Sequence, residues 1–119
     1  MKVTVIDYGL SNLLSVRHAF AHFGAETLLT SDPADVLAAE KLVLPGVGAF
    51  KDGMDGLAQL GLVEPIRQKA AAGTPLLGIC LGMQMLFDES EEFGLHKGLG
   101  LIPGRVVKIP DTDVDGHPQ

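Results

Sequence analysis

Short apolar runs alternate along the chain with longer stretches in which apolar residues recur every three or four positions. The apolar runs are residues 2–7, 26–30, 41–45 and 75–79. Runs of this length, bounded by turn-forming residues, are typical of β-strands. The run at 75–79 is almost wholly apolar, which predicts a strand buried on both faces of a sheet.

The stretch between the first two runs has the pattern of an amphipathic helix. Over residues 12–23 the apolar side chains share one helical stripe: Leu13, Val16, Phe20 and Phe23. Ser11 is a suitable N-cap, and Gly24 is a suitable stop because glycine readily adopts the left-handed conformation that ends many helices. His18 and His22 lie opposite the stripe without an acidic partner, so we interpret them as solvated surface residues and not as metal ligands.

Helical patterns follow the other strands as well. One opens at Ser31-Asp32-Pro33, where a capping oxygen precedes a proline suited to the first helical position. Others cover residues 52–60, 62–72 and 81–87. The alternation predicts an α/β fold with three layers, αβα, around a mostly parallel sheet, in which ligand sites lie at the carboxyl ends of the strands.

The patterns become weaker after residue 87. The acidic cluster 88–92 indicates a solvated helix end, and residues 105–109 indicate one further strand. Residues 110–119 hold turn formers without periodicity, so the chain stops with no closing element. We therefore expect residues 1–119 to be a single partial domain, truncated at its carboxyl end.

Composition narrows the class of protein. Hydrophobic residues make up 46% of the chain and charged residues 20%, as in an ordinary soluble globular protein. Nine scattered basic residues against fifteen acidic ones give a net charge of −6, which argues against nucleic-acid binding. No apolar run is long enough for a membrane span, and one cysteine allows neither a disulfide nor a zinc cluster. We expect an unprocessed cytoplasmic protein without a metal or another cofactor.

Cys80 has the strongest chemical signal. It stands between a predicted strand and a predicted helix, with Gly78 and Gly82 as its second neighbours. This arrangement is typical of a nucleophile elbow, in which the glycines leave room for a strained turn and the helix N-terminus favours the thiolate. The alternative is a packed thiol at the end of a core strand, which is the commoner fate of a free cysteine. The two glycines favour the elbow.

The segment Pro45-Gly46-Val47-Gly48 ends a neighbouring strand. In a parallel sheet this loop would reach the same edge as Cys80, where its amides and that of Leu81 could face a developing oxyanion. An ordinary turn is the alternative, and for so short a motif it is the commoner structure. A phosphate-binding loop is less consistent with the sequence, because no Lys-Ser or Lys-Thr pair follows the glycines.

No general base is evident from the local sequence. His96 and His117 lie in loop-like stretches, and nothing near them orients either ring. One carboxylate of the cluster 88–92 could reach the pocket of the cysteine, but the pattern does not indicate which one.

Three segments taken together resemble the class I glutamine amidotransferases: residues 7–16, 44–50 and 78–87. The cysteine motif is shared across that class. The opening Asp-Tyr-Gly segment and residues 98–106 are similar to the glutaminase subunit of imidazole glycerol phosphate synthase. The resemblance covers residues 1 to about 109.

The resemblance implies a reaction and a site. Cys80 would attack the side-chain carboxamide of glutamine, ammonia would leave, and water would release glutamate from a thioester. The amides of Val47 and Leu81 would hold the oxyanion. Three residues would grip the amino-acid end of glutamine: Gly48, Gln84 and Glu92. Ammonia would pass to a (βα)8-barrel synthase subunit, the partner in a heterodimer that makes imidazole glycerol phosphate in histidine biosynthesis.

Two departures from the family pattern matter. Ser11 stands where the family usually has glycine in its opening turn. The family's catalytic histidine and glutamate, in a His-x-Glu arrangement, lie beyond residue 119. Within this chain the nucleophile therefore lacks the general base of a catalytic triad. We expect this chain alone to be inactive or nearly so with glutamine, and we expect its missing strands to leave it unstable or prone to aggregation.

Two other functions stay open at this stage. The chain could be a non-catalytic binding module that keeps the scaffold without its base, or the glutaminase subunit of another synthase, such as one for pyridoxal phosphate. An in-frame His-x-Glu downstream would distinguish the enzyme from the module. A neighbouring gene for a barrel with phosphate-binding loops would favour histidine biosynthesis.

Overall fold

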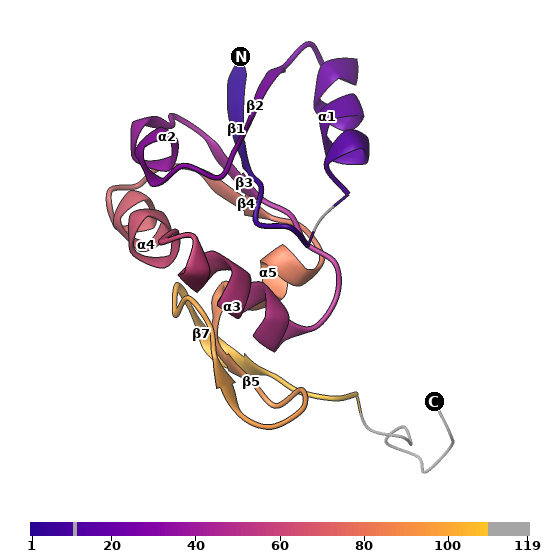
Figure 1. Ribbon diagram of the computed structural model, residues 1–119, viewed down its shortest axis with the longest axis vertical. Coiled ribbons are helices and arrows are strands. Elements are labelled where there is room, and N and C mark those ends of the chain that lie inside the picture. The colour runs from indigo at the N-terminus through magenta and orange to yellow at the C-terminus, as the bar shows by residue number, and fades with distance from the viewer. Residues whose placement is uncertain (11, 110–119) are drawn as a thin grey trace.

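The computed structural model describes residues 1–10 and 12–109, and Figure 1 shows how their helices and strands are arranged. In chain order the elements are β1 (Lys2–Ile6), α1 (Leu13–His22), β2 (Glu26–Thr30), α2 (Pro33–Ala38), β3 (Leu42–Leu44), α3 (Phe50–Gln59), α4 (Val63–Ala71), β4 (Leu76–Gly78), α5 (Leu81–Met85), β5 (Phe87–Ser90), β6 (His96–Lys97) and β7 (Ile102–Val106). Through α5 this order is the predicted one, with bounds that differ by a few residues. None of the described helices has the length and apolar character needed to cross a membrane.

The main sheet has four parallel strands in the order β2-β1-β3-β4. Lys2 pairs with Glu26 across β1 and β2, and Leu44 pairs with Gly78 across β3 and β4. Because these strands run in the same direction, the loops that leave β3 and β4 emerge at the same edge of the sheet. The predicted α/β fold with a mostly parallel sheet is confirmed.

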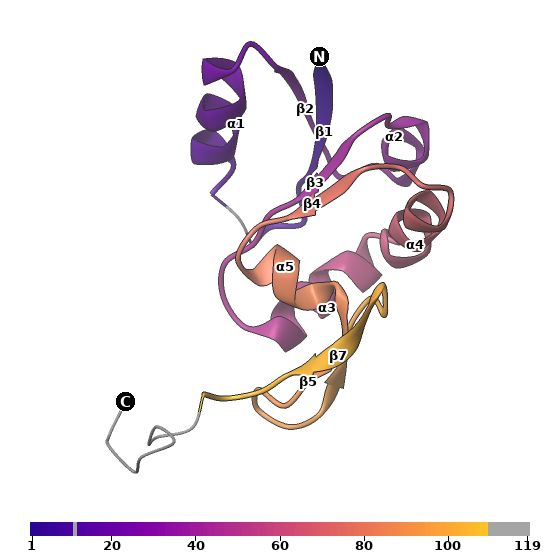
Figure 2. The same cartoon turned by 180° about the vertical axis from the view of Figure 1, so that it is seen from behind.

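Helices cover both faces of this sheet, as the two opposite views of Figures 1 and 2 show. Successive strand residues point to opposite faces. Val3, Val5 and Val43 therefore pack with the partly buried apolar residues of α1. Ile6 and Leu44 face the other way, into a larger core with side chains from α2, α3, α4 and α5. The layer order helix, sheet, helix follows directly from the alternation in β1.

The first helix corrects two details of the prediction. Its N-cap is Asn12, whose side-chain oxygen accepts a hydrogen bond of 3.3 Å from the Ser15 amide. The predicted cap, Ser11, lies outside the described residues. Phe23 was expected on the buried stripe, but it is 81% exposed, because the helix ends at His22 and Phe23 is its C-cap in the turn that leads to β2.

The prediction that residues 75–79 form a strand buried on both faces is wrong. β4 pairs with β3 on one side, and within residues 1–10 and 12–109 no strand pairs with its other side. Leu77 at its centre is 52% exposed. β4 is therefore the edge of the sheet in the described part of the chain, although its sequence is that of an internal strand.

A second, three-stranded sheet with the order β6-β5-β7 was not predicted. The acidic cluster 88–92 was expected to end a helix, but its first residues belong to β5. Arg105 on β7 explains the difference, because it forms ion pairs with Glu89 and Glu91 and so neutralises the like charges that would weaken a strand. The predicted strand at 105–109 overlaps β7 only at its first two residues.

Candidate functional site

Cys80 links β4 to α5, with its side chain exposed. Its backbone has φ 55° and ψ −119°, a strained conformation for a residue other than glycine. Gly82 permits the turn, because a Cβ there would overlap the backbone oxygen of Leu44. A Cβ at Gly78 would come within 2.7 Å of Met83 Cα. The predicted elbow geometry, with an exposed sulfur between a strand and a helix, is confirmed.

The loop after β3 lies directly beside this elbow. The Leu81 amide donates a hydrogen bond of 3.1 Å to the Gly46 carbonyl, and the Ile79 amide donates one of 3.0 Å to the Leu44 carbonyl. The predicted proximity of the segment 45–48 to Cys80 is therefore confirmed.

The two amides that the family resemblance assigns to the oxyanion both have partners in this structure. The Leu81 amide donates to Gly46, and the Val47 amide donates to the Leu10 carbonyl at 2.8 Å. The Gly46 carbonyl and the Val47 N–H belong to the same peptide unit. The peptide between Gly46 and Val47 therefore supplies the acceptor for the Leu81 amide, and it also directs the Val47 amide toward the Leu10 carbonyl in the loop after β1.

Sequence reasoning missed Tyr8, which follows β1 and contacts the same loop. Its hydroxyl donates a buried hydrogen bond of 2.5 Å to the Pro45 carbonyl. Burial raises the pKa of the Tyr8 phenol above its ordinary value, so the hydroxyl stays protonated and remains a donor. The two residues are 37 positions apart, and no local pattern indicates such a contact.

Two of the residues expected to grip glutamine line one cavity of about 460 Å³. Gln84 reaches it from α5, and Glu92 reaches it from the turn after β5. The remaining lining residues are Ser90, Glu91, Phe93, Val106, Val107 and Lys108. Gly48 is not among these residues. It lies in the loop between β3 and α3, where its φ of 109° is of the kind that glycine adopts readily.

Glu92 is held in place by two hydrogen bonds. Its backbone amide donates to the hydroxyl of the buried Ser90 at 3.1 Å. Its carboxylate oxygen Oε1 accepts from the Phe50 amide at 2.8 Å, at the N-terminus of α3. Only one carboxylate oxygen is used in this contact, so the other is available to a ligand in the cavity.

The described histidines give no metal site. His18 and His22 are exposed on α1, which confirms that they are surface residues. His96 lies in β6 and not in a loop, with its Nε2 3.0 Å from the Phe93 carbonyl oxygen. His117 falls outside the described residues. Within residues 1–10 and 12–109, no three His, Cys, Asp or Glu side chains are grouped so that they could hold a metal ion.

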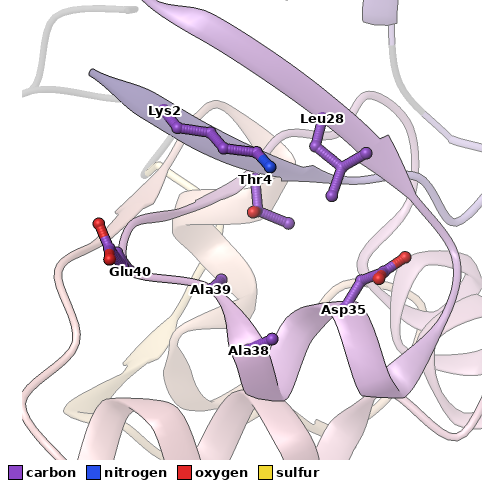
Figure 3. A pocket seen from close by; sticks show the side chains of 7 residues that line it. All are labelled: Lys2, Thr4, Leu28, Asp35, Ala38, Ala39 and Glu40. Carbon is purple, nitrogen blue, oxygen red and sulfur yellow. The ribbon is translucent and has the colours of Figure 1, made fainter.

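A second cavity, of about 290 Å³, lies at the other end of the sheet and is shown in Figure 3. Lys2 and Thr4 line it from the start of β1, and Asp35 and Glu40 line it from α2 and the segment after it. Since β1 and β4 are parallel, this end of the sheet is opposite to the end that carries Cys80. The cavity is separate from the elbow.

The Glutamine amidotransferase class-I family model matches residues 4–117, and the chain belongs to this family. Over 115 residues it is 57% identical to imidazole glycerol phosphate synthase subunit HisH 1 of Legionella pneumophila strain Lens, covering 97% of this chain and 54% of that protein. It is 54% identical to the HisH subunit of Geobacter sulfurreducens over 115 residues, with coverages of 97% and 55%. The chain spans about half the length of these curated relatives.

A solved structure agrees with the fold. The crystal structure of a glutamine amidotransferase superimposes with a TM-score of 0.76 at 20% identity, covering 89% of this chain and 56% of the other. The predicted resemblance to class I glutamine amidotransferases, and in particular to the glutaminase subunit of imidazole glycerol phosphate synthase, is confirmed.

Proposed function

We propose that the protein hydrolyses glutamine to glutamate and ammonia through a thioester on Cys80. The observation that carries the proposal is the exposed sulfur in a strained turn, directly beside the loop 45–48, in a chain of the class I glutamine amidotransferase family. The similarity to HisH subunits supports a more specific role, in which ammonia is supplied to a (βα)8-barrel synthase subunit for histidine biosynthesis in the cytoplasm.

The reaction has two stages. In the first, Cys80 Sγ bonds to the carboxamide carbon of glutamine, the C–N bond breaks, and the nitrogen leaves as ammonia after taking a proton. In the second, water attacks the thioester, glutamate leaves, and the thiol is restored. Covalent catalysis divides one difficult step into two easier ones. The base that moves these protons is the histidine of the His-x-Glu pair, which the family resemblance puts beyond residue 119.

The oxyanion of each tetrahedral intermediate would be held by the Val47 and Leu81 amides. In the observed arrangement both donate to carbonyls. Rotation of the peptide between Gly46 and Val47 would remove the acceptor of Leu81 and take the Val47 N–H away from Leu10 in one motion. Each hydrogen bond has a net value of about 1 kcal/mol. The observed arrangement, with both bonds made, would therefore be favoured over the rotated one by roughly 30-fold until contacts with substrate or partner oppose it.

Substrate would bind with its amino-acid end in the cavity that Gln84 and Glu92 line. The free oxygen of the Glu92 carboxylate would accept from the ammonium group of glutamine, and the amide side chain of Gln84 offers both a donor and an acceptor. Gly48 would contribute its backbone. An ammonium ion held by a carboxylate forms a charge-assisted hydrogen bond, which is stronger than a neutral one.

Covalent labelling tests the proposal. The full-length protein, assembled with the synthase subunit, is treated with a glutamine-analogue electrophile and assayed for glutamate release. We expect one label, on Cys80, and loss of both label and activity in Cys80→Ala. Activity retained in Cys80→Ala would refute the glutaminase function and favour a binding module on the same scaffold.

A further inference from the structure

We propose that Tyr8 is a positioning residue for the oxyanion-forming peptide, which it serves by fixing the Pro45 carbonyl at the start of the loop. The inference rests on the proposed glutaminase function and adds a residue that the family resemblance did not assign. Tyr8 acts through the loop and does not touch the reacting atoms.

The hydrogen bond to Pro45 is well suited to hold one end of the loop. Tyr8 is only 5% exposed, and Pro45 is fully buried, so water does not compete for the Pro45 carbonyl. The donor and acceptor are 2.5 Å apart. A buried carbonyl that lost this partner would be left unsatisfied, which is more costly than the loss of an exposed hydrogen bond.

The Tyr8 ring is itself held between the loop and α3. A Cβ at Gly46 would overlap the Tyr8 hydroxyl, so glycine is required there for the ring to reach Pro45. On the other side, a Cβ at Gly56 would lie 3.3 Å from Tyr8 Cδ2 and 3.1 Å from the Tyr8 carbonyl oxygen. The absence of side chains at these two positions leaves room for the ring, and the hydrogen bond to Pro45 sets where the hydroxyl points.

The segment after β1 therefore contacts the loop at two points on either side of Gly46. The Tyr8 hydroxyl binds the Pro45 carbonyl, and the Leu10 carbonyl accepts from the Val47 amide. Rotation of the Gly46–Val47 peptide breaks the second contact and leaves the first intact. Tyr8 thus provides a fixed end about which the peptide turns, so that the Val47 amide reaches one defined position near Cys80 while the Leu81 amide loses its acceptor.

Kinetics of Tyr8→Phe in the full-length protein with its synthase subunit test this role. Phenylalanine keeps the ring between Gly46 and Gly56 and removes only the hydroxyl. We expect kcat for glutamate release to fall about 3- to 10-fold, the range for one lost hydrogen bond. We expect KM for glutamine to stay within about twofold, because the loop acts on the transition state and not on the bound substrate.

Two further measurements separate positioning from general stability. Thr30→Val is the control, since it removes the hydroxyl of another buried residue, at the end of β2. That hydroxyl donates a part-buried hydrogen bond of 2.6 Å to Asp35 and accepts one of 3.0 Å from the Asp32 amide. This variant should lose stability without losing kcat. Iodoacetamide, which needs no oxyanion site, should alkylate Cys80 equally fast in Tyr8→Phe, whereas a glutamine analogue with a carbonyl at the reacting centre should react more slowly.

The outcomes are distinct. A normal kcat in Tyr8→Phe, or an equal fall of kcat in Thr30→Val, would overturn the positioning role while Cys80→Ala still abolished activity. Equal slowing of both labels would also overturn it, because the hydroxyl would then act on the thiol and not on the loop. Activity retained in Cys80→Ala would instead refute the proposed function, and the role of Tyr8 would be lost with it.

Discussion

The carboxylate of Glu92 accepts a hydrogen bond of 2.8 Å from the Phe50 amide, although the two residues are 42 positions apart. Phe50 is the first residue of α3, and the helix has no side-chain cap at Ala49. Glu92 therefore supplies an acceptor and a negative charge where the helix dipole favours both. The same side chain lines the cavity proposed for glutamine, so one residue joins the substrate site to the loop that ends at α3.

Substitution at Glu92 should separate its two contributions. Glu92→Gln keeps an oxygen that can accept from Phe50, so the free energy of unfolding should fall by only about 0.5 kcal/mol, whereas Glu92→Ala should lose about 1 kcal/mol or more. Both changes remove the carboxylate, so KM for glutamine should rise by at least about tenfold in each. Chemical denaturation and glutaminase kinetics on the full-length protein measure the two effects. An unchanged KM in Glu92→Gln would contradict binding of the substrate ammonium.

The glycine after the elbow should tolerate no side chain. In Gly82→Ala the Cβ would meet the Leu44 backbone oxygen, which cannot move without breaking the β3 pairing, so unfolding should become easier by about 3 kcal/mol. Gly73→Ala is the control. Its φ of 87° is unfavourable for alanine but no atom lies within 4 Å, so about 1–2 kcal/mol is expected. Equal losses, measured by denaturant titration, would contradict the packing explanation.

The buried phenol should make stability fall at alkaline pH. An unfolded tyrosine has a pKa near 10.0, and burial raises that of Tyr8 in the folded protein. Above pH 10 the unfolded state therefore binds fewer protons than the folded state, and stability decreases as pH rises, by up to about 1.4 kcal/mol per pH unit. Tyr8→Phe lacks this contribution. Its stability deficit should be constant below about pH 9 and should shrink above pH 10; a constant deficit to pH 11 would contradict the assignment.

No described strand pairs with the outer edge of β4, and this edge should promote association of the 119-residue chain. Leu77→Lys puts a charge on the edge strand, and lysine at such an edge opposes pairing with another chain. The average mass of Leu77→Lys, measured by static light scattering, should therefore rise less with protein concentration than that of the unchanged sequence. Leu14→Lys, which replaces an exposed leucine on α1, is the control and should have a smaller effect. Equal effects would show that exposed apolar area, and not the strand edge, drives association.

The parts of the fold that sequence predicted are those with a local signal. Residues 2–7 are an apolar run typical of a strand, and such runs alternate along the chain with helical patterns, so β1 and a parallel sheet covered by helices could be predicted from local sequence. Cys80 could be singled out because glycines stand two residues before it and two residues after it in the chain.

The missed features depend on residues far apart in sequence. The acidic cluster 88–92 by itself favours a solvated surface, and the ion pairs of Arg105 with Glu89 and Glu91 favour a strand there. Residues 75–79 are almost wholly apolar, so the sequence favours an internal strand. The exposure of Leu77 depends instead on which elements lie beside that strand. The contacts of Tyr8 with Pro45 and of Glu92 with Phe50 join residues 37 and 42 positions apart, and no local sequence pattern predicts them.

The amide plane shared by Gly46 and Val47 has a consequence for how activity can vary. In the proposed rotation, one turn of this peptide would release both hydrogen-bond donors, so no intermediate would hold a single donor ready. Partial activity in a sample would then measure the fraction of molecules in which the peptide has rotated, and not weaker binding of the oxyanion in every molecule. Regulation at this loop would change how often the enzyme is competent while leaving each competent molecule equally fast.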